Sequence, residues 1–125
     1  MGIIHVTAQL RNISGKGKRY EADFLVDTGA VDCMAPGDEL RKLGIKPERK
    51  VTDEWANGKP VKYEVGFARV SFLGSETIAP VIFGPPNVEP ILGVIALEAT
   101  GISVDPRTQQ LKRMPALPLK IAAKK

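Results

Sequence analysis

Apolar and polar residues alternate along most of this chain, which is the pattern of half-buried β-strands. In the segment IIHVTAQL every second residue is apolar, namely Ile4, Val6, Ala8 and Leu10. The segment RYEADFLV continues the strand pattern after the turn-forming residues SGKGK. Two strand patterns joined by a glycine-containing turn are typical of a β-hairpin, so we expect a hairpin here.

A second hairpin is predicted within residues 46–72, where the strand pattern returns on both sides of Asn57-Gly58. This dipeptide strongly favours a tight hairpin turn, because both residues tolerate a positive φ. Apolar residues hold the odd positions up to Val65 and the even positions after Gly66. The buried face of the strand therefore switches near this glycine, and we expect a bulge or a bend there.

The remaining segments predict short helices and further strands. A helix is expected in PGDELRKLG, opened by Gly37 or Asp38 and ended by Gly44. TIAPVIF predicts a strand, and the loop GPPNVEP leads through ILG into a second short helical segment, VIALEATG. ISVD and QLKRM, separated by the turn PRTQ, predict a last hairpin. The chain is thus predicted to be all-β with one or two short helices.

At 125 residues, with 43% apolar and 26% charged residues, the chain has the composition of one globular domain. We expect this domain to span residues 1–114 and a flexible basic tail to follow in residues 115–125. No apolar run approaches the roughly 20 residues of a membrane span, and the N-terminus lacks the features of a signal peptide. Cys33 is the single cysteine and allows no internal disulfide. These features favour a cytoplasmic protein without a membrane partner.

The net charge of +4 comes from the C-terminal end of the chain. Six of the 18 basic residues lie from Arg107 onward, where no acidic residue occurs, so 12 basic and 14 acidic residues precede it. A nucleic-acid site needs a basic surface with aromatic residues for stacking, and the pattern predicts none. We therefore expect no nucleic-acid partner, and the basic tail is the weaker alternative site for one.

The segment FLVDTGAVDC raises the question of catalysis, because the carboxylate of Asp27 follows a buried strand pattern directly. Asp-Thr-Gly by itself most often forms a turn. Its surroundings narrow the choice. Gly58, in the predicted hairpin turn, follows Asp27 by 31 residues, and Ile91 of the ILG segment follows it by 64 residues.

This order of segments resembles the retropepsin-like aspartic proteases, the family of the retroviral proteases and their bacterial and archaeal relatives. The resemblance covers approximately residues 3–105 and rests on DTGA after an apolar strand, the glycine-tipped hairpin, and ILG before a short helix. It implies a closed, barrel-like all-β fold and an aspartic endopeptidase that cleaves extended polypeptide without a metal or another cofactor. Retropepsins carry the motif once per chain and dimerise. This chain carries it once, so the resemblance implies a homodimer.

The resemblance also assigns roles to single residues. The Asp27 side chains of two subunits would meet at the two-fold axis, where two close carboxylates cannot both ionise and therefore share a proton. The ionised carboxylate would activate a water molecule, and the protonated one would donate to the peptide carbonyl. Thr28 would reach across to the partner's loop. Gly29 and Ala30 would leave room for the partner and for the substrate backbone.

Two further segments belong to the implied site. The hairpin tip would form a flap that closes over bound peptide and excludes water. The flap residues are Trp55, Ala56, Asn57, Gly58 and Lys59. The second apolar-glycine motif consists of Ile91, Leu92 and Gly93. The tryptophan of the flap has two open interpretations, since it either lines the substrate side or packs the flap against the body.

The chain departs from the retroviral pattern at two positions. In the retroviral enzymes an acidic residue follows DTGA, an arginine follows the second glycine, and the two pair near the dimer contact. Val31 and Val94 occupy these positions here, so we expect an apolar contact in place of the ion pair. The C-terminal end is also longer, with the expected hairpin around residues 106–109.

A non-catalytic peptide-binding or dimerisation module that keeps this fold is the alternative function. His5 is either a ligand or base or, since no second ligand is evident, an exposed strand residue. Cys33 is either a redox-sensitive thiol or a small buried core residue. Arg69 and Glu64 are interpreted as solvated strand positions.

Overall fold

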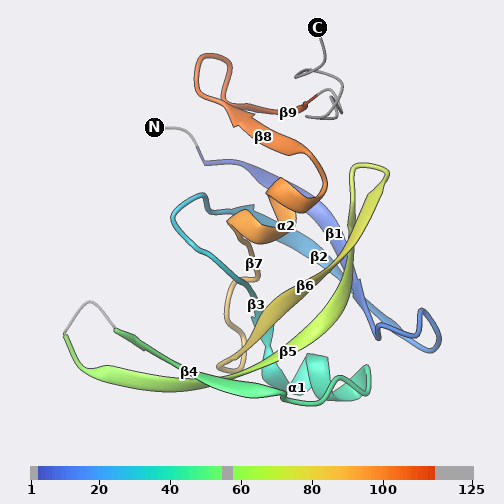
Figure 1. Cartoon of the computed structure of the whole chain (residues 1–125), viewed down its shortest axis with the longest axis vertical. Coiled ribbons are helices and arrows are strands. Elements are labelled where there is room, and N and C mark those ends of the chain that lie inside the picture. The colour runs from blue at the N-terminus through green and yellow to red at the C-terminus, as the bar shows by residue number, and fades with distance from the viewer. Residues whose placement is uncertain (1–2, 55–57, 115–125) are drawn as a thin grey trace, which may run out of the picture.

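The computed structural model describes residues 3–54 and 58–114, and residues 1–2, 55–57 and 115–125 lie outside that part. Over the described residues the chain forms nine strands and two short helices (Figure 1). The strands are β1 (His5–Arg11), β2 (Arg19–Val26), β3 (Cys33–Pro36), β4 (Arg49–Glu54), β5 (Pro60–Phe72), β6 (Ser75–Gly84), β7 (Ile91–Leu92), β8 (Ile102–Asp105) and β9 (Gln110–Arg113). The helices are α1 (Gly37–Lys42) and α2 (Val94–Ala99).

Six of the strands form a closed barrel. The order of hydrogen-bonded strands is β1-β2-β7-β3-β6-β5, and β5 also pairs with β1, so the sheet returns on itself. Closure pairs each of these strands on both sides, which is how barrels avoid open sheet edges. β4 lies outside the ring and forms with β5 a hairpin that projects from the body (Figure 1). The predicted closed, barrel-like all-β fold is confirmed.

The predicted first hairpin forms, and its alternate apolar residues enter the barrel core. β1 and β2 pair in an antiparallel register along their whole length. Ala8, Leu10 and Phe24 are almost completely buried, whereas their neighbours Thr7 and Asp23 are exposed. Burial of each large apolar side chain contributes about 1.5–3 kcal/mol to folding. The alternation thus predicted both the strands and the face that they turn inward.

β5 changes its buried face at Gly66 without a bulge. Its pairing with β6 runs without an inserted residue from Val65 to Phe72, and its pairing with β4 ends at Val65. A Cβ atom at Gly66 would lie 2.8 Å from the Lys46 carbonyl oxygen. Glycine is therefore required at the point where the backbone of Lys46 lies against β5. Of the predicted bulge or bend, the strand has the bend, as Figure 1 shows.

The sequence pattern does not predict β3. This four-residue strand pairs in parallel with β6, from Cys33 opposite Val81 to Pro36 opposite Gly84. Its length offers too few positions for an alternation to be recognised. The two predicted helices do form. Gly44 follows the end of α1 with a φ of +78°, the left-handed conformation that commonly terminates a helix.

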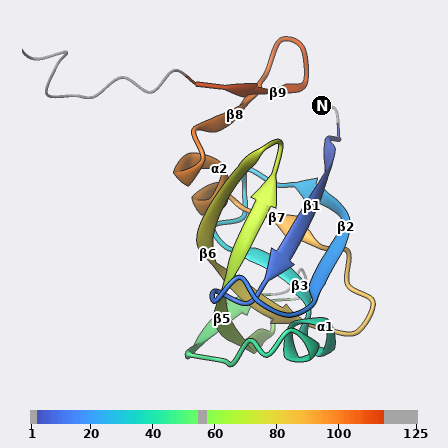
Figure 2. The ribbon, with the colours of Figure 1, turned by 90° about the vertical axis from the view of Figure 1, so that its right-hand side faces the viewer.

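The last predicted hairpin also forms. β8 and β9 pair as a separate two-stranded sheet next to α2. Figure 2 shows this hairpin beyond one end of the barrel. Neither helix within the described ranges is long and apolar enough to cross a membrane.

An ion-pair cluster holds the seam where β1 and β5 close the barrel. Arg11 and Arg69 stand opposite each other in this pairing, and their guanidinium groups donate to the two carboxylate oxygens of Glu76 at 2.6 and 3.0 Å. The interpretation of Arg69 as a solvated position is therefore wrong. Arg69 is half-buried and ion-paired. The carboxylate of Glu76 offsets the repulsion between the two arginine side chains, which stand opposite each other. Glu64 is partly exposed and accepts from Arg41 at 2.7 Å.

Replacement of Glu76 with Gln should lower the stability of the fold in a pH-dependent way. Hydrogen bonds from Ser71, Arg11 and Arg69 hold the pKa of Glu76 below its ordinary value of 4.5. A carboxyl group with a lowered pKa stabilises the folded state above its ordinary pKa, and this contribution is lost as the pH falls through the folded-state pKa. Urea unfolding should therefore separate Glu76→Gln from wild type at neutral pH and bring the two together well below pH 4.5.

Glu21→Gln is the matched control, since this carboxylate lies on an exposed part of β2 and accepts a hydrogen bond from Gln9. It should leave the free energy of unfolding within about 0.5 kcal/mol of wild type. A stability loss in Glu76→Gln that stays constant with pH would contradict the role of the ionised carboxylate.

Candidate active site

The loop between β2 and β3 holds the Asp27 side chain in a defined position. The Asp27 N–H donates to the Leu92 carbonyl oxygen at 3.0 Å, and the Ala30 N–H donates to the Asp27 carbonyl oxygen at 3.1 Å. The Gly29 N–H donates to Asp27 Oδ1 at 2.9 Å. The carboxylate is half-buried, and its Oδ2 atom has no hydrogen-bond partner in the described part of the chain. One oxygen is therefore fixed while the other remains available.

The second predicted motif lies directly beside this loop. Ile91 and Leu92 form β7, which pairs in parallel with Leu25 and Val26 at the end of β2. On its other side β7 pairs with β3 at Met34. The motif is thus inserted between the strand that leads into the Asp27 loop and the strand that leaves it.

Gly93 allows the chain to cross the loop at close range. A Cβ atom on this residue would lie 2.4 Å from the Asp32 carbonyl oxygen and 2.8 Å from that of Val31, closer than real side chains approach. The next residue, Val94, donates its N–H to the Ala30 carbonyl oxygen at 2.8 Å. The absence of a side chain at Gly93 therefore lets the start of α2 hold the loop by backbone hydrogen bonds.

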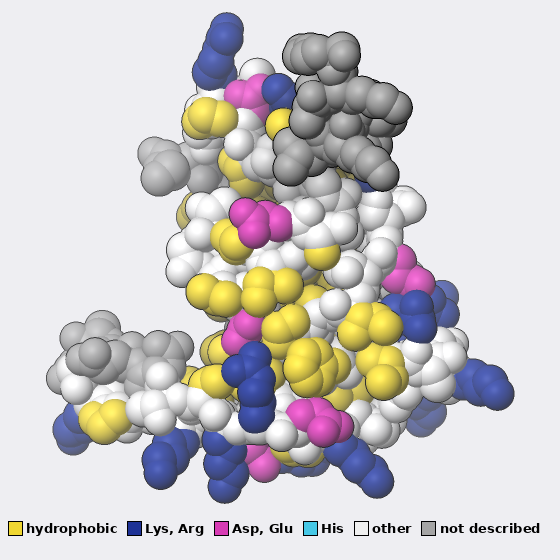
Figure 3. Space-filling model, in the orientation of Figure 1, with side chains coloured by type: hydrophobic (Ala, Val, Ile, Leu, Met, Phe, Trp, Pro, Cys, Tyr) yellow, Lys and Arg dark blue, Asp and Glu magenta, His cyan; other side chains and the backbone are white. Residues whose placement is uncertain are grey.

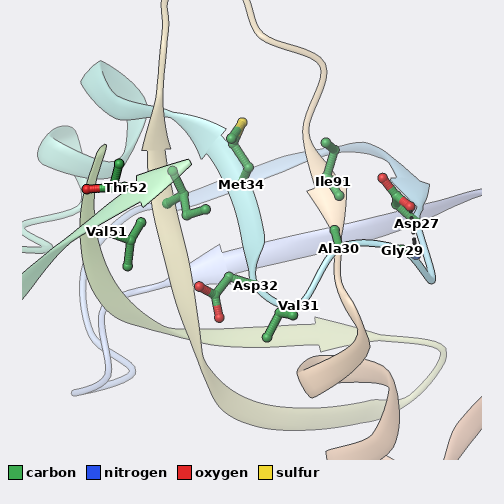
Figure 4. A pocket seen from close by; sticks show the side chains of 10 residues that line it. Asp27, Gly29, Ala30, Val31, Asp32, Met34, Val51, Thr52 and Ile91 are labelled. Carbon is green, nitrogen blue, oxygen red and sulfur yellow. Dashed lines mark hydrogen bonds between the residues drawn. The ribbon is translucent and has the colours of Figure 1, made fainter. Parts of the chain in front are cut away.

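An open groove of about 420 Å³ runs between the Asp27 loop and β4 (Figure 4). The loop supplies one wall, and Val51 and Thr52 of β4 lie opposite. Met34 and Ile91 also line the groove and make most of its remaining surface apolar. The structure thus brings Asp27, Gly29, Ala30 and Ile91 of the second motif to one groove.

Comparison with solved structures gives this fold a name. The solution structure of the simian foamy virus (mac) protease is similar to the chain, with a TM-score of 0.53 and 18% identity, over 76% of this chain and 92% of that one. This chain has the retropepsin-like fold. The crystal structure of a retropepsin-like aspartic protease from Rickettsia conorii aligns with a TM-score of 0.49 and 25% identity, over 83% and 85% of the two chains. No protein-family model and no curated protein matches the sequence.

The hairpin predicted as the flap of the retropepsin-like fold is formed by β4 and β5. Trp55, Ala56 and Asn57 of the predicted flap lie outside the described residues. Gly58 has a φ of +80°, which suits a tight turn at this point, and Lys59 is exposed. Of this hairpin, the described residues that reach the groove belong to β4 and not to the predicted tip.

Asp32 is a second carboxylate in the groove, and sequence reasoning missed it. The side chain is half-buried and makes no hydrogen bond or ion pair with another residue in the described ranges. Figure 4 shows it on the part of the loop that faces β4. The sequence feature that could have identified Asp32 as a site residue is its place two residues after Ala30 of the DTGA motif. No sequence pattern marks Val51 and Thr52 as groove residues, because they lie opposite the Asp27 loop only in the folded chain.

Thr28 and Val31 are exposed residues of the loop that line different cavities. Thr28 is exposed, and its hydroxyl has no partner among the residues that the structure describes. With Asp27 it lines a second cavity of about 390 Å³, which also touches Ile4, the residue before β1. Val31 is 64% exposed, and Val94 is half-buried. The two valines predicted to replace an ion pair therefore both lie where the start of α2 meets the Asp27 loop. In a single chain most of the Val31 side chain is exposed to solvent.

The remaining candidates lie outside the groove. Burial raises the pKa of the Cys33 thiol to about 11, so this thiol is a protonated core group, as one of its two interpretations held. His5 is exposed and lies 2.9 Å from a Glu89 carboxylate oxygen. Within the described ranges, no three His, Cys, Asp or Glu residues are grouped closely enough to hold a metal ion.

Many Lys and Arg side chains lie on one edge of the molecule. Figure 3 shows Lys and Arg side chains along the edge formed by α1 and the β4–β5 hairpin. Among the described residues that line the two cavities beside Asp27, none is Lys or Arg. The charged side chains of the groove are therefore the carboxylates of Asp27 and Asp32.

Proposed function

We propose that this chain is one subunit of a homodimeric aspartic endopeptidase. The observation that carries the proposal is the position of Asp27. Its carboxylate is half-buried at the wall of an open groove, with one oxygen bound to the Gly29 N–H, in a fold shared with a viral protease. This arrangement suits a carboxylate that has to hold and release a proton beside a bound peptide.

The chemistry requires two Asp27 side chains, one from each subunit. At hydrogen-bond distance the two carboxylates share one proton, and the titration belongs to the pair. The ionised carboxylate draws a proton from a water molecule, and the water oxygen attacks the peptide carbonyl carbon. The protonated carboxyl donates to the carbonyl oxygen, and the leaving nitrogen is protonated as the C–N bond breaks. In this scheme neither Asp27 forms a covalent bond to the substrate.

The geometry of β4 favours an extended peptide as substrate. β4 is the last strand in the sheet order, so its outer edge is not paired within the sheet. Val51 and Thr52 are neighbours whose side chains point to opposite faces of the strand, yet both line the groove. The edge of β4 therefore faces the groove and offers backbone groups to a peptide that binds as an added strand.

The surface around the Asp27 loop supports a second copy of the chain as partner. Val31 is 64% exposed and Ile95 is 36% exposed, and the Ile95 N–H donates to the Val31 carbonyl oxygen. These two apolar side chains therefore form one small exposed surface beside Asp27. A second subunit that brings its own Asp27 to the axis would cover this surface and supply a partner for the Thr28 hydroxyl.

Asp27→Asn should abolish cleavage and leave the fold intact, because an amide cannot exchange a proton with water or with the peptide. We expect the rate of cleavage of a peptide library to fall on the order of 10³-fold or more. The matched control is Asp23→Asn, on the exposed face of β2, which should cleave at the wild-type rate.

A statine-type inhibitor separates an enzyme from a binding module. Its hydroxyl takes the place of the attacking water, so it should raise the melting temperature of the wild-type protein and not that of Asp27→Asn. Cleavage by folded Asp27→Asn at the wild-type rate would place the chemistry elsewhere. Neither cleavage nor an inhibitor shift in the wild type would favour the binding module.

Val31→Asp should weaken the dimer, because it puts an unpaired charge into the surface that the partner covers. We expect the dissociation constant measured by sedimentation to rise on the order of a hundredfold. Val94→Arg in the same chain should recover part of the loss by restoring an ion pair. Ile78→Asp is the control, since Ile78 is 49% exposed and does not line either cavity beside Asp27. Wild-type activity per chain that does not fall on dilution would contradict a site built from two subunits.

Asp32 should favour peptides with Lys or Arg at one position near the cleaved bond. Its carboxylate lacks a partner in an otherwise apolar part of the groove, so a basic side chain gains an ion pair there. A peptide with Lys should be cleaved with a kcat/KM about tenfold higher than the same peptide with norleucine. Asp32→Asn should remove this preference and leave cleavage of the norleucine peptide unchanged. An unchanged preference would show that Asp32 does not contact the substrate.

A further inference from the structure

The C-terminal hairpin of β8 and β9 is a separate unit that stands beside the Asp27 loop. Its two strands form their own sheet and do not join the barrel (Figure 2). A two-stranded hairpin is marginally stable by itself, so its position depends on what holds each end. Ile102 is buried in the core, and Leu111 packs against it. These apolar contacts attach the hairpin but are non-directional and do not fix its angle.

The turn of the hairpin forms a wall of the second cavity beside Asp27. Val104, Pro106 and Gln109 line this cavity together with Asp27 and Thr28. The turn is braced by Asp105, whose Oδ1 accepts from the Arg107 N–H at 2.9 Å and whose carbonyl oxygen accepts from the Gln109 N–H at 2.8 Å. A braced turn transmits a tilt of the hairpin to the surroundings of Thr28, because the turn itself resists deformation.

Arg113 ties the opposite end of the hairpin to the barrel. Its Nη1 atom donates to Ser75 Oγ at 2.5 Å, and its Nη2 atom donates to the Leu73 carbonyl oxygen at 2.6 Å. Leu73 lies in the turn between β5 and β6, two strands of the closed ring, and Ser75 is the first residue of β6. One planar guanidinium group that donates twice fixes direction as well as distance.

We infer that Arg113 is a positioning residue for the Asp27 loop. By holding the hairpin at one angle against the β5–β6 turn, it keeps the braced turn in place beside Asp27 and Thr28. Arg113 is exposed and belongs to neither the barrel core nor the groove. Its removal therefore leaves the barrel folded and changes the angle of the hairpin. Only the effect on catalysis rests on the proposed function.

The first test follows backbone amide resonances by NMR in Arg113→Ala, Arg113→Lys and Ser75→Ala. In Arg113→Ala we expect shifts at Asp27 and Thr28 in addition to those at the β5–β6 turn. Hydrogen exchange in β8 and β9 should rise about tenfold, while exchange in the barrel strands stays unchanged. Arg113→Lys and Ser75→Ala each keep one of the two contacts and should give intermediate shifts.

Lys112→Ala is the matched control, since Lys112 is the exposed neighbour on β9. It should shift neither Asp27 nor Thr28. Shifts in Arg113→Ala that stay confined to residues 73–75 and 101–114 would overturn the inference, because Arg113 would then serve only the local contact.

The second test measures peptide cleavage at protein concentrations that keep the dimer saturated. Arg113→Ala should lower kcat about three- to tenfold with KM nearly unchanged, because the surroundings of Asp27 and Thr28 change and the β4 wall of the groove does not. An unchanged kcat together with shifted Thr28 resonances would overturn the catalytic part of the inference. A wild-type protein that cleaves nothing would instead count against the proposed function, and the NMR test would still decide the role of Arg113.

Discussion

The backbone crossing between the Asp27 loop and the start of α2 is the constraint on which the site depends. Three hydrogen bonds define it: the Asp27 N–H donates to the Leu92 carbonyl oxygen, the Val94 N–H donates to that of Ala30, and the Ile95 N–H donates to that of Val31. Between them Gly93 passes so close to Asp32 that a Cβ atom would lie 2.4 Å from its carbonyl oxygen. Because backbone groups and not side chains make this contact, the loop is held in place without the use of its side chains, which can therefore line the two cavities.

The barrel carries the Asp27 loop, and the two hairpins outside the barrel form the walls opposite it. The closed ring of six strands provides a rigid frame, since every strand in it is paired on both sides. Each hairpin contributes one wall: Val51 and Thr52 of β4 face the groove, and Val104 of β8 lines the second cavity. Hairpins outside a ring have fewer stabilising contacts and open more readily than the ring itself. The Asp27 loop thus sits on the frame, between two walls that the hairpins outside the ring supply.

The charged side chains that line the groove are acidic. The groove contains carboxylates but no Lys or Arg among its described lining residues, and many of the Lys and Arg side chains visible in Figure 3 lie along the edge formed by α1, β4 and β5. A second Asp27 brought beside the first would therefore meet no nearby cation in the groove lining. Under these conditions two carboxylates lower their energy by sharing a proton, which is the state that acid catalysis in the proposed dimer requires.

Local patterns along the sequence determined the hairpins, the two helices and the place of Asp27 directly after a strand, because alternation and turn residues act over a few neighbouring positions. The tertiary structure decided what depends on distant segments. β3 is too short to show a pattern and exists through its pairing with β6. Asp32 and Val51 share a groove because β4 lies opposite the loop, and Arg113 of the last hairpin donates to the Leu73 carbonyl oxygen, 40 residues away in the sequence. Such contacts join residues far apart in the sequence, and no local periodicity encodes them.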